Sequence, residues 1–318
     1  MMQHYLQTKE EYKDCILFYR LGDFYEMFFD DAVLVSKELE LTLTGKSCGM
    51  EERAPMCGIP YHAVEGYLNR LVANGHKVAI CEQVEDPKLA KGIVKREVVR
   101  IVTPGTNINT QALDETKNNY IMCIVYIADR YGLSVADVST GDYFVTELDS
   151  GRKLLDEIAK FSPSEIICNE SLYMSGLDLE DLKNRLGITI YSLDAWYFDD
   201  GMCTKVLKDH FKVSSLEGLG LTDYNCGLIA AGALLQYLYE TQKTSLAHLT
   251  GIISYTTGKY MLLDSSSRRN LELCETLREK QKRGSLLWVL DKTKTAMGAR
   301  TLRSFVEQPL IHLSLIHI

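Results

Sequence analysis

Two short apolar runs near the start of the chain, residues 16–19 and 24–29, are separated by four residues that include Gly22-Asp23. This pattern predicts two β-strands joined by a turn. Because side chains two apart in a strand point to the same face, Phe24 and Glu26 would lie side by side. An aromatic ring beside a carboxylate is an unusual pair to project outward from such a hairpin. The pattern alone favours a core Phe24 and a solvated Glu26, since apolar strand residues usually face a core.

The following residues alternate between helical and strand patterns. Apolar residues at helical spacing predict helices over residues 31–41 and 64–72. Residues 77–83 and 97–102 have the composition of strands, and the polar, glycine-containing residues 46–57 are expected to form a loop. Together with the hairpin, these elements predict a small mixed α/β domain.

A Pro-Gly break at residues 103–107 and a polar stretch separate this domain from a second pattern. Three strands, a helix and a fourth strand are predicted there, at residues 121–127, 133–138, 143–146, 152–161 and 165–168. This order of elements predicts a second α/β domain.

From residue 225 the chain has the pattern of long amphipathic helices. One apolar stripe is formed by Leu228, Ala231, Leu234, Leu235 and Leu238. A further helix is expected to begin near Arg268, after the N-cap candidates of residues 264–267. Residues 286–290 and 297–306 continue the helical pattern.

The fold class predicted from these patterns is multidomain α/β, with the beginning of an all-α domain at the end of the chain. The predicted segments are a mixed α/β domain (1–104), a linker (105–119), a second α/β domain (120–223), the start of a helical domain (224–312) and a tail (313–318). A hydrophobic content of 46% and a charged content of 25% suit a soluble globular protein. With no apolar run of membrane-spanning length and no signal peptide pattern, we expect a cytoplasmic protein.

The nine cysteines are scattered, and their spacing fits neither a zinc site nor a secreted disulfide framework. We expect them to be small buried hydrophobes, and we predict no metal ligands and no catalytic residues.

A net charge of −8 argues against indiscriminate nucleic-acid binding, because phosphate contacts supply most nonspecific affinity. Any DNA contact must therefore be local. The basic residues that could provide it are Lys88, Lys91, Lys95, Arg96 and Arg100. Of these, Lys95, Arg96 and Arg100 are the predicted contacts to the DNA backbone. A solvated strand edge explains the same run equally well.

Three separated blocks carry a resemblance to a known family. They are LFYRLGDFYEMFFDDA, APMCGIPYHAVEGYLNRLVANGHKVAICEQVEDP and VKREVVRIVTPGT, in this order. Together they resemble the N-terminal domain of the MutS family of DNA mismatch repair proteins. In that family the Phe of a Phe-x-Glu motif wedges into the minor groove beside a mispaired base, and the Glu hydrogen-bonds that base. The matching residues here are Phe24 and Glu26.

The resemblance extends along the chain. Residues 120–223 resemble the family's connector domain, which has a ribonuclease-H-like fold, and DSSSRRNLEL and LDKTKTAMGARTLRSFVEQPLIH resemble the start of its core, or lever, domain. The resemblance implies binding to double-stranded DNA that contains a mismatch or a small loop. It also implies a homodimer in the full-length parent, downstream mismatch-repair factors as partners, no membrane, and a bacterial, nucleoid-associated cytoplasmic location.

Members of this family continue into further lever helices, a DNA clamp and a C-terminal ATPase. No stretch here matches G-x-x-x-x-G-K-[ST], the loop whose backbone N–H groups cradle phosphates. We therefore expect no cofactor and no enzymatic activity in this chain, and ATP and Mg²⁺ in the C-terminal domain of the full-length parent. Residues 313–318 depart from the family and can be encoded by a common sequencing adapter, so we expect a non-native tail.

Two other hypotheses come from different functional classes. The first hypothesis is a metal-dependent nuclease, because enzymes with a ribonuclease-H-like fold hold metal ions with clustered carboxylates. The candidate carboxylates here are Asp129, Asp137 and Asp142. A structural role is favoured for them, because Asp129 and Asp142 lie in predicted turns, where Asp is common. The second hypothesis is a protein-interaction module of a repair complex.

Overall fold

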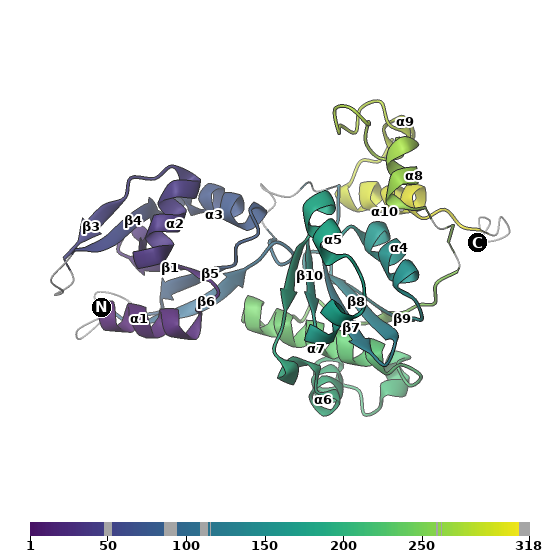
Figure 1. Cartoon of the computed structure of the whole chain (residues 1–318), viewed down its shortest axis with the longest axis horizontal. Coiled ribbons are helices and arrows are strands. Elements are labelled where there is room, and N and C mark those ends of the chain that lie inside the picture. Colours follow the sequence, from purple (N-terminus) through teal and green to yellow (C-terminus); the bar gives the residue numbers. More distant parts are fainter. Residues whose placement is uncertain are drawn as a thin grey trace. The chain divides into compact units, whose positions relative to one another are not determined.

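The computed structural model describes residues 1–47, 53–85, 94–108, 114, 116–258, 260–261 and 263–311. The chain divides into two compact units (Figure 1). The first comprises Met1–Ala112 with Leu238–Leu246, and the second comprises Leu113–Tyr237 with Ala247–Ile318.

The first unit is built on a mixed sheet with the strand order β3-β4-β2-β1-β5-β6. Its strands are β1 (Ile16–Leu21), β2 (Phe24–Phe28), β3 (Thr44–Lys46), β4 (Ala54–Pro60), β5 (Val78–Gln83) and β6 (Arg96–Val102). The central strand β1 pairs antiparallel with β2 and parallel with β5. Strand β2 is therefore held between β1 and β4, with a defined register on each side.

Helices cover both faces of this sheet. Figure 1 shows α2 (Phe29–Leu39) and α3 (Val64–Ala73) on one side and α1 (Met2–Glu11) on the other. Strand alternation divides the core accordingly. Phe18, Tyr25 and Met27 pack with the side of α2 and α3, whereas Tyr19 and Phe28 pack with the side of α1. A single 3₁₀ turn, η1 (Tyr61–Ala63), leads from β4 into α3.

The hairpin, the two helices and the two later strands predicted for this unit are confirmed. The loop predicted over residues 46–57 is wrong at both ends, because Lys46 ends β3 and residues 54–57 belong to β4. Residues 48–52 lie outside the described residues. Gly and Pro hide the strand pattern of β4, whose backbone is fixed by pairing with β2. Helix α1 was not predicted, since Tyr5 is its one fully buried side chain.

The second unit is built on another mixed sheet, with the order β11-β10-β7-β8-β9-β12. Its strands are β7 (Tyr120–Ile127), β8 (Arg130–Asp137), β9 (Asp142–Leu148), β10 (Glu165–Cys168), β11 (Thr189–Ser192) and β12 (Ile253–Ser254). The first three form an antiparallel meander, and β10 and β11 extend it in parallel from β7. Two mixed sheets with helices confirm the predicted α/β class.

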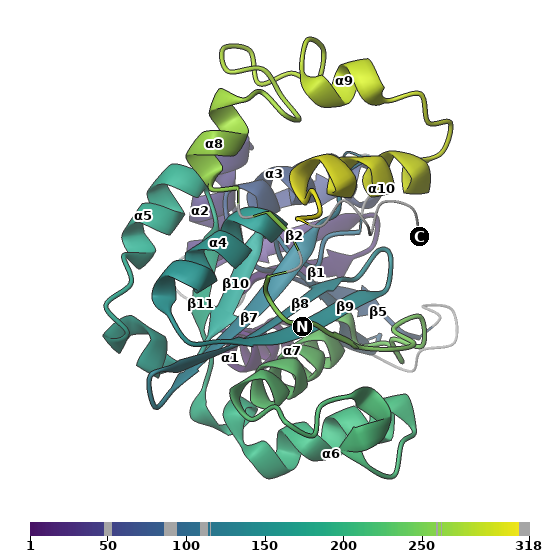
Figure 2. The ribbon, with the colours of Figure 1, turned by 90° about the vertical axis from the view of Figure 1, so that its right-hand side faces the viewer.

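Helices cover both faces of this second sheet as well (Figure 2). The two faces are covered by α4 (Gly151–Phe161) with α5 (Leu179–Leu186), and by α6 (Asp200–Phe211) with the part of α7 (Cys226–Gln242) up to Tyr237. Short 3₁₀ turns connect the elements at η2 (Glu170–Met174), η3 (Ala195–Phe198) and η4 (Leu216–Leu219).

Helix α7 packs on the second sheet, although the sequence-based boundary at residue 224 separates it from that sheet. A Cβ on Gly132 of β8 would lie 2.0 Å from the carbonyl oxygen of Cys226, so helix and strand backbones touch at this glycine. Tyr143 of β9 also donates a hydrogen bond to the carbonyl of Ala231. Helix α7 is buried over more than the predicted apolar stripe, because Ile229, on another side of the helix, is also buried.

Three short helices follow in the last part of the chain: α8 (Ser265–Asn270), α9 (Leu286–Leu290) and α10 (Ala296–Glu307). A side-chain oxygen of Asp264, Ser285 or Thr295 accepts a backbone N–H at each N-terminus. Helices are therefore present at the predicted places, but α8 begins at Ser265 rather than near Arg268, and α8 and α9 are shorter than the predicted long helices. The tail over residues 313–318 lies outside the described residues.

Every described cysteine is buried and unpaired, as predicted, and Cys48 lies outside the described residues. Within the described ranges, none of the helices has both the length and the apolar character needed to cross a bilayer.

Asp31 at the start of α2 connects three elements of the first unit. Its Oδ2 accepts the N–H of Leu17 in β1 at 3.0 Å, and its Oδ1 lies 2.9 Å from the Nζ of Lys9 in α1. The same Nζ donates to the carbonyl of Cys15 at 2.6 Å. The Asp31 side chain is nearly buried, so this network holds α1 against the sheet in a poorly hydrated place.

We expect Asp31→Ala to destabilise the first unit by about 2–4 kcal/mol, because a buried N–H and an ammonium lose their acceptor. Hydrogen exchange measured by mass spectrometry should show lost protection in β1 and α1. The matched control is Asp30→Ala, which removes an exposed carboxylate one residue away and should cost less than about 1 kcal/mol. Equal losses of protection in both variants would contradict this role of Asp31.

Candidate nucleic-acid interface

The β1–β2 hairpin ends in the predicted two-residue turn, Gly22-Asp23. Gly22 has a φ of +58°, a conformation that favours glycine at this position of a tight hairpin. The turn is fixed from both sides, since Arg20 Nε donates to the Gly22 carbonyl at 2.6 Å and Tyr61 N donates to the Asp23 carbonyl at 2.9 Å. The residue that follows, Phe24, is therefore presented from an ordered backbone.

Phe24 is not a core residue. Its side chain is 45% exposed, at a strand position flanked by Leu21 of β1 and Pro60 of β4. Phe28, on the same face, is only 1% exposed, because it packs with Tyr5 of α1. The face shared by Phe24 and Phe28 is therefore covered by a helix at one end of β2 and open at the other.

Glu26 lies between these two aromatic residues on that face. Its Oε2 is 2.6 Å from the Nζ of Lys46, and the two side chains are 17% and 34% exposed, respectively. Glu26 is therefore an ion-paired, half-buried carboxylate rather than a solvated edge charge. Lys46 belongs to the edge strand β3, which lies two strands away from β2 in the sheet.

Gly58 of β4 is the direct partner of Glu26. A Cβ there would lie 3.7 Å from Cγ of Glu26 and 3.8 Å from Cδ1 of Phe24. These are ordinary contact distances, so glycine leaves free the space that a larger side chain would occupy between ring and carboxylate. Sequence reasoning missed both Gly58 and Lys46. The alternation in Ala-Pro-Met-Cys-Gly-Ile-Pro was the available signal for β4, and no signal marked Lys46.

The opposite face of the hairpin is braced by a second polar group. The Tyr25 hydroxyl donates to Glu82, and Arg20 Nη1 lies 3.6 Å from the same carboxylate. The Arg20 guanidinium also lies 4.0 Å from the ring centroid of Tyr61. Burial, and then the hydrogen bond to Glu82, raises the pKa of Tyr25, so this hydroxyl stays a donor. Such bracing keeps the open end of β2 rigid.

The predicted basic contacts differ in their surroundings. Lys95 is exposed, and a hydrogen bond to Glu97 raises its pKa. Arg96 is buried, with Nε donating to the Arg20 carbonyl at 2.8 Å. Arg100 Nη2 donates to the Thr106 carbonyl, and burial lowers the pKa of the guanidinium. Lys88 and Lys91 lie outside the described residues.

Of the three carboxylates in the nuclease hypothesis, the structure brings two together, since Asp137 is opposite Asp142 and both accept from Asn118 Nδ2. Asp129 precedes β8 and Asp137 ends it, so these two lie about 26 Å apart at 3.3 Å per residue. Asp137 is fully buried, and its carboxylate accepts hydrogen bonds from Asn118 Nδ2, Asn119 N, Ser139 N and Ser139 Oγ. Among the residues that the structure describes, no group of three His, Cys, Asp or Glu side chains could hold a metal ion. The geometry supports the structural role.

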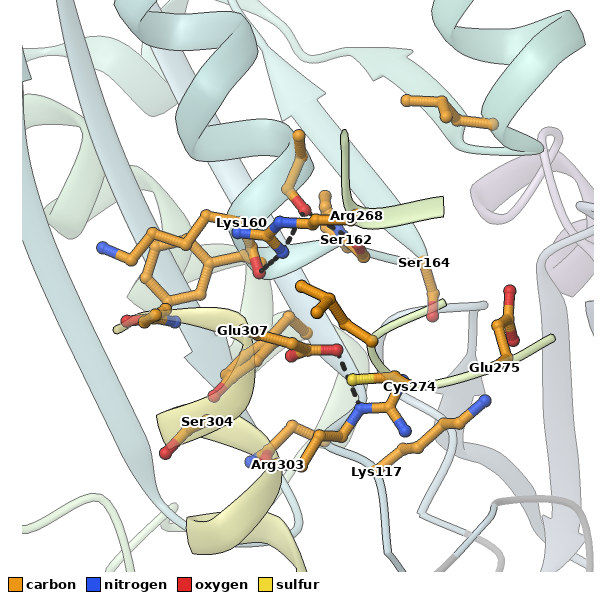
Figure 3. A pocket seen from close by; sticks show the side chains of 18 of the residues that line it. Lys117, Lys160, Ser162, Ser164, Arg268, Cys274, Glu275, Arg303, Ser304 and Glu307 are labelled. Atoms are coloured by element: carbon orange, nitrogen blue, oxygen red, sulfur yellow. Dashed lines mark hydrogen bonds and ion pairs between the residues drawn. The ribbon is translucent and has the colours of Figure 1, made fainter. Parts of the chain in front are cut away.

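A cavity of about 460 Å³ lies in the second unit, where α4, α8 and α10 meet (Figure 3). The charged residues of its lining are Lys117, Lys160, Arg268, Arg269, Arg300, Arg303, Glu275 and Glu307. Arg268 Nη1 donates to the carbonyls of Ala159 and Lys160 in the last turn of α4, and Arg303 Nε lies 3.0 Å from Glu307 within α10. Arg268 therefore has a structural task, since it caps α4 and joins it to α8.

Sequence comparisons match the chain to one family along most of its length. Family models described as MutS domain I, MutS domain II and MutS domain III match residues 1–111, 119–250 and 266–317. The second match includes α7, in agreement with the packing of that helix on the second sheet.

Individual relatives agree with the family models. The chain is 70% identical over 98% of its length to the DNA mismatch repair protein MutS of Lachnoclostridium phytofermentans, of which it covers 33%. It is 55% identical to the protein of the same name from Ruminiclostridium cellulolyticum and 52% identical to that of Acetivibrio thermocellus, over 98% of the chain and 36% of each relative. The chain spans about a third of the length of these relatives. With three successive domains matched in order, the chain belongs to the MutS family.

Proposed function

We propose that this chain recognises mispaired or unpaired bases in double-stranded DNA, at the start of mismatch repair. Phe24 acts as the wedge in the minor groove and Glu26 provides the hydrogen bond to the displaced base. The observation that carries the proposal is the exposed Phe24 ring beside a half-buried carboxylate at the open end of a braced strand. The relatives' name, DNA mismatch repair protein MutS, supports the same conclusion.

The physical basis of discrimination is the deformability of the DNA. Inserting an aromatic ring unstacks a base step at a cost of a few kcal/mol, and bending the site adds about 1–6 kcal/mol. A mismatched pair is already poorly stacked, so its cost is lower. One Phe24 side chain can therefore serve many different mismatches.

Glu26 requires a different explanation, because a carboxylate is repelled by phosphates. Burial against DNA and nearby negative charge both favour the neutral acid. We infer that Glu26 is protonated in the mismatch complex and donates a hydrogen bond to the displaced base.

Backbone contacts complete the proposed interface. Of the three predicted cations, Lys95 is the one with an exposed side chain, so we assign it the direct phosphate contact. Arg96 and Arg100 would act by supporting the backbone around it, through their bonds to carbonyl groups.

This chain spans about a third of the length of its relatives. The wider roles are therefore proposed for a protein of the relatives' full length. In it, mismatch binding would be coupled to ATP and Mg²⁺ in a C-terminal domain. The protein would act as a homodimer that engages downstream repair factors in the bacterial cytoplasm, close to the nucleoid.

Phe24→Ala should lower affinity for a mismatched duplex by about 10- to 100-fold, the value of aromatic stacking on a base, and abolish the preference over a matched duplex. Fluorescence anisotropy with both duplexes measures this in the complete gene product that carries the chain. The control Val33→Ala trims a similarly exposed apolar side chain on α2 and should change neither affinity. An unchanged mismatch preference in the Phe24 variant would refute the wedge.

Glu26→Gln should keep or increase mismatch affinity and remove its pH dependence, because the amide donates a hydrogen bond at every pH. The unsubstituted protein should bind more tightly as the pH falls, since the protonated acid is the bound form. Binding titrations between pH 5 and pH 9 make this comparison. Loss of binding at every pH in the Gln variant would exclude the protonated acid.

A further inference from the structure

Lys46 reaches the proposed mismatch site from the edge of the sheet. Thr44 of β3 is opposite Met56 of β4, which is opposite Phe28 of β2, so these residues share one face. Lys46, two residues after Thr44, projects from the same face. Its ammonium lies 2.6 Å from Glu26 Oε2 and 5.6 Å from the Phe28 ring centroid. The lysine therefore spans β4 to contact the carboxylate.

This contact requires the ionised carboxylate of Glu26, whereas the proposed function requires the protonated acid. Uptake of a proton from solvent and binding of a displaced base would therefore remove the ion pair with Lys46. Across the described part of the chain, Lys46 is the one cation in an ion pair with Glu26. Arg20 is on the other face of the hairpin, where it pairs with Glu82. Exchange of partners at Glu26 therefore has to break the contact with Lys46.

We propose that Lys46 is a positioning residue, which holds the Glu26 side chain until a displaced base replaces the lysine as its partner. Lys46 is thereby a determinant of mismatch specificity. This inference rests on the proposed function of Phe24 and Glu26. A matched duplex has no displaced base, so the ion pair between Lys46 and Glu26 stays intact. The charge of Lys46 then reduces the repulsion between the Glu26 carboxylate and the DNA phosphates. On a mismatched duplex the ion pair opens, and the base takes its place on Glu26.

The proposal makes an asymmetric prediction for Lys46→Met, which keeps the stem of the side chain and removes its charge. Affinity for both duplexes should fall, with a shallower dependence on salt, because a cation near the phosphates is lost. The ratio of mismatched to matched affinity should rise by about two- to fivefold, the size of a half-exposed ion pair, since Glu26 no longer has to leave a partner.

A double-mutant cycle isolates this coupling. Affinities for a duplex with one G·T pair and for its matched counterpart are measured by anisotropy in the complete gene product. The four proteins are the unsubstituted form, K46M, E26Q and the double variant. In the E26Q background, the Lys46 substitution should change both affinities by the same factor and leave their ratio constant.

Two controls separate charge from position. Lys46→Arg keeps the ion pair and should keep the ratio. Lys37→Met removes an exposed charge from α2, on the other side of the sheet, and should leave the ratio unchanged. Circular dichroism verifies folding, and Lys46→Gln repeats the test if the Met variant is destabilised.

Two results would overturn the role of Lys46, provided that the unsubstituted protein prefers the mismatch. One is a ratio of mismatched to matched affinity that is unchanged or lower in K46M. The other is a change of this ratio that is equally large in the E26Q background. Absence of any mismatch preference in the unsubstituted protein would instead refute the proposed function itself. The two failures are thus distinguishable in one experiment.

Discussion

The register of β2 is the constraint on which the proposed site depends. The strand is paired on both sides, so that Glu26 is opposite Tyr19 on β1 and Gly58 on β4. Alternate residues are thereby divided between two faces, and a slip of one residue would exchange them. Tyr25 goes into the core beneath α2 and α3, and Phe24 goes to the face of α1. An exposed ring on a strand that is otherwise well packed is the result.

Electrostatic pairing explains how an acidic chain can present such a face. With a net charge of −8, the chain gives most DNA no general attraction. Cations near the hairpin are engaged locally: Arg96 with backbone carbonyls, Lys46 with Glu26, and Arg20 with Glu82. At the proposed interface, this arrangement would favour selectivity for a distorted duplex, because little nonspecific affinity competes with it.

Sequence reasoning located the hairpin, because strand alternation and a Gly-Asp turn are local signals. Phe24 and Glu26 were selected as site residues through the family resemblance, and their role stays a prediction. The same reasoning could not place Lys46, whose partner depends on the order of β3, β4 and β2 in the sheet. Arg96 was an expected surface cation and is buried, because its place is set by contact with the carbonyl of Arg20, 76 positions away in the chain. Apolar periodicity indicated the helix at α7 but not the sheet beneath it, which required the close approach at Gly132.

The parallel pairing of β1 with β5 has a consequence for how the first unit folds. Strands β1 and β2 are joined by two residues, so this hairpin can close within microseconds. Strand β5 is paired with β1 in the register Ile16 to Val78, which requires closure of a loop of about sixty residues. Non-local pairing of this kind slows folding. During synthesis, the hairpin would therefore emerge early with its apolar face exposed, and would become a rigid platform only when β5 and β6 have been added.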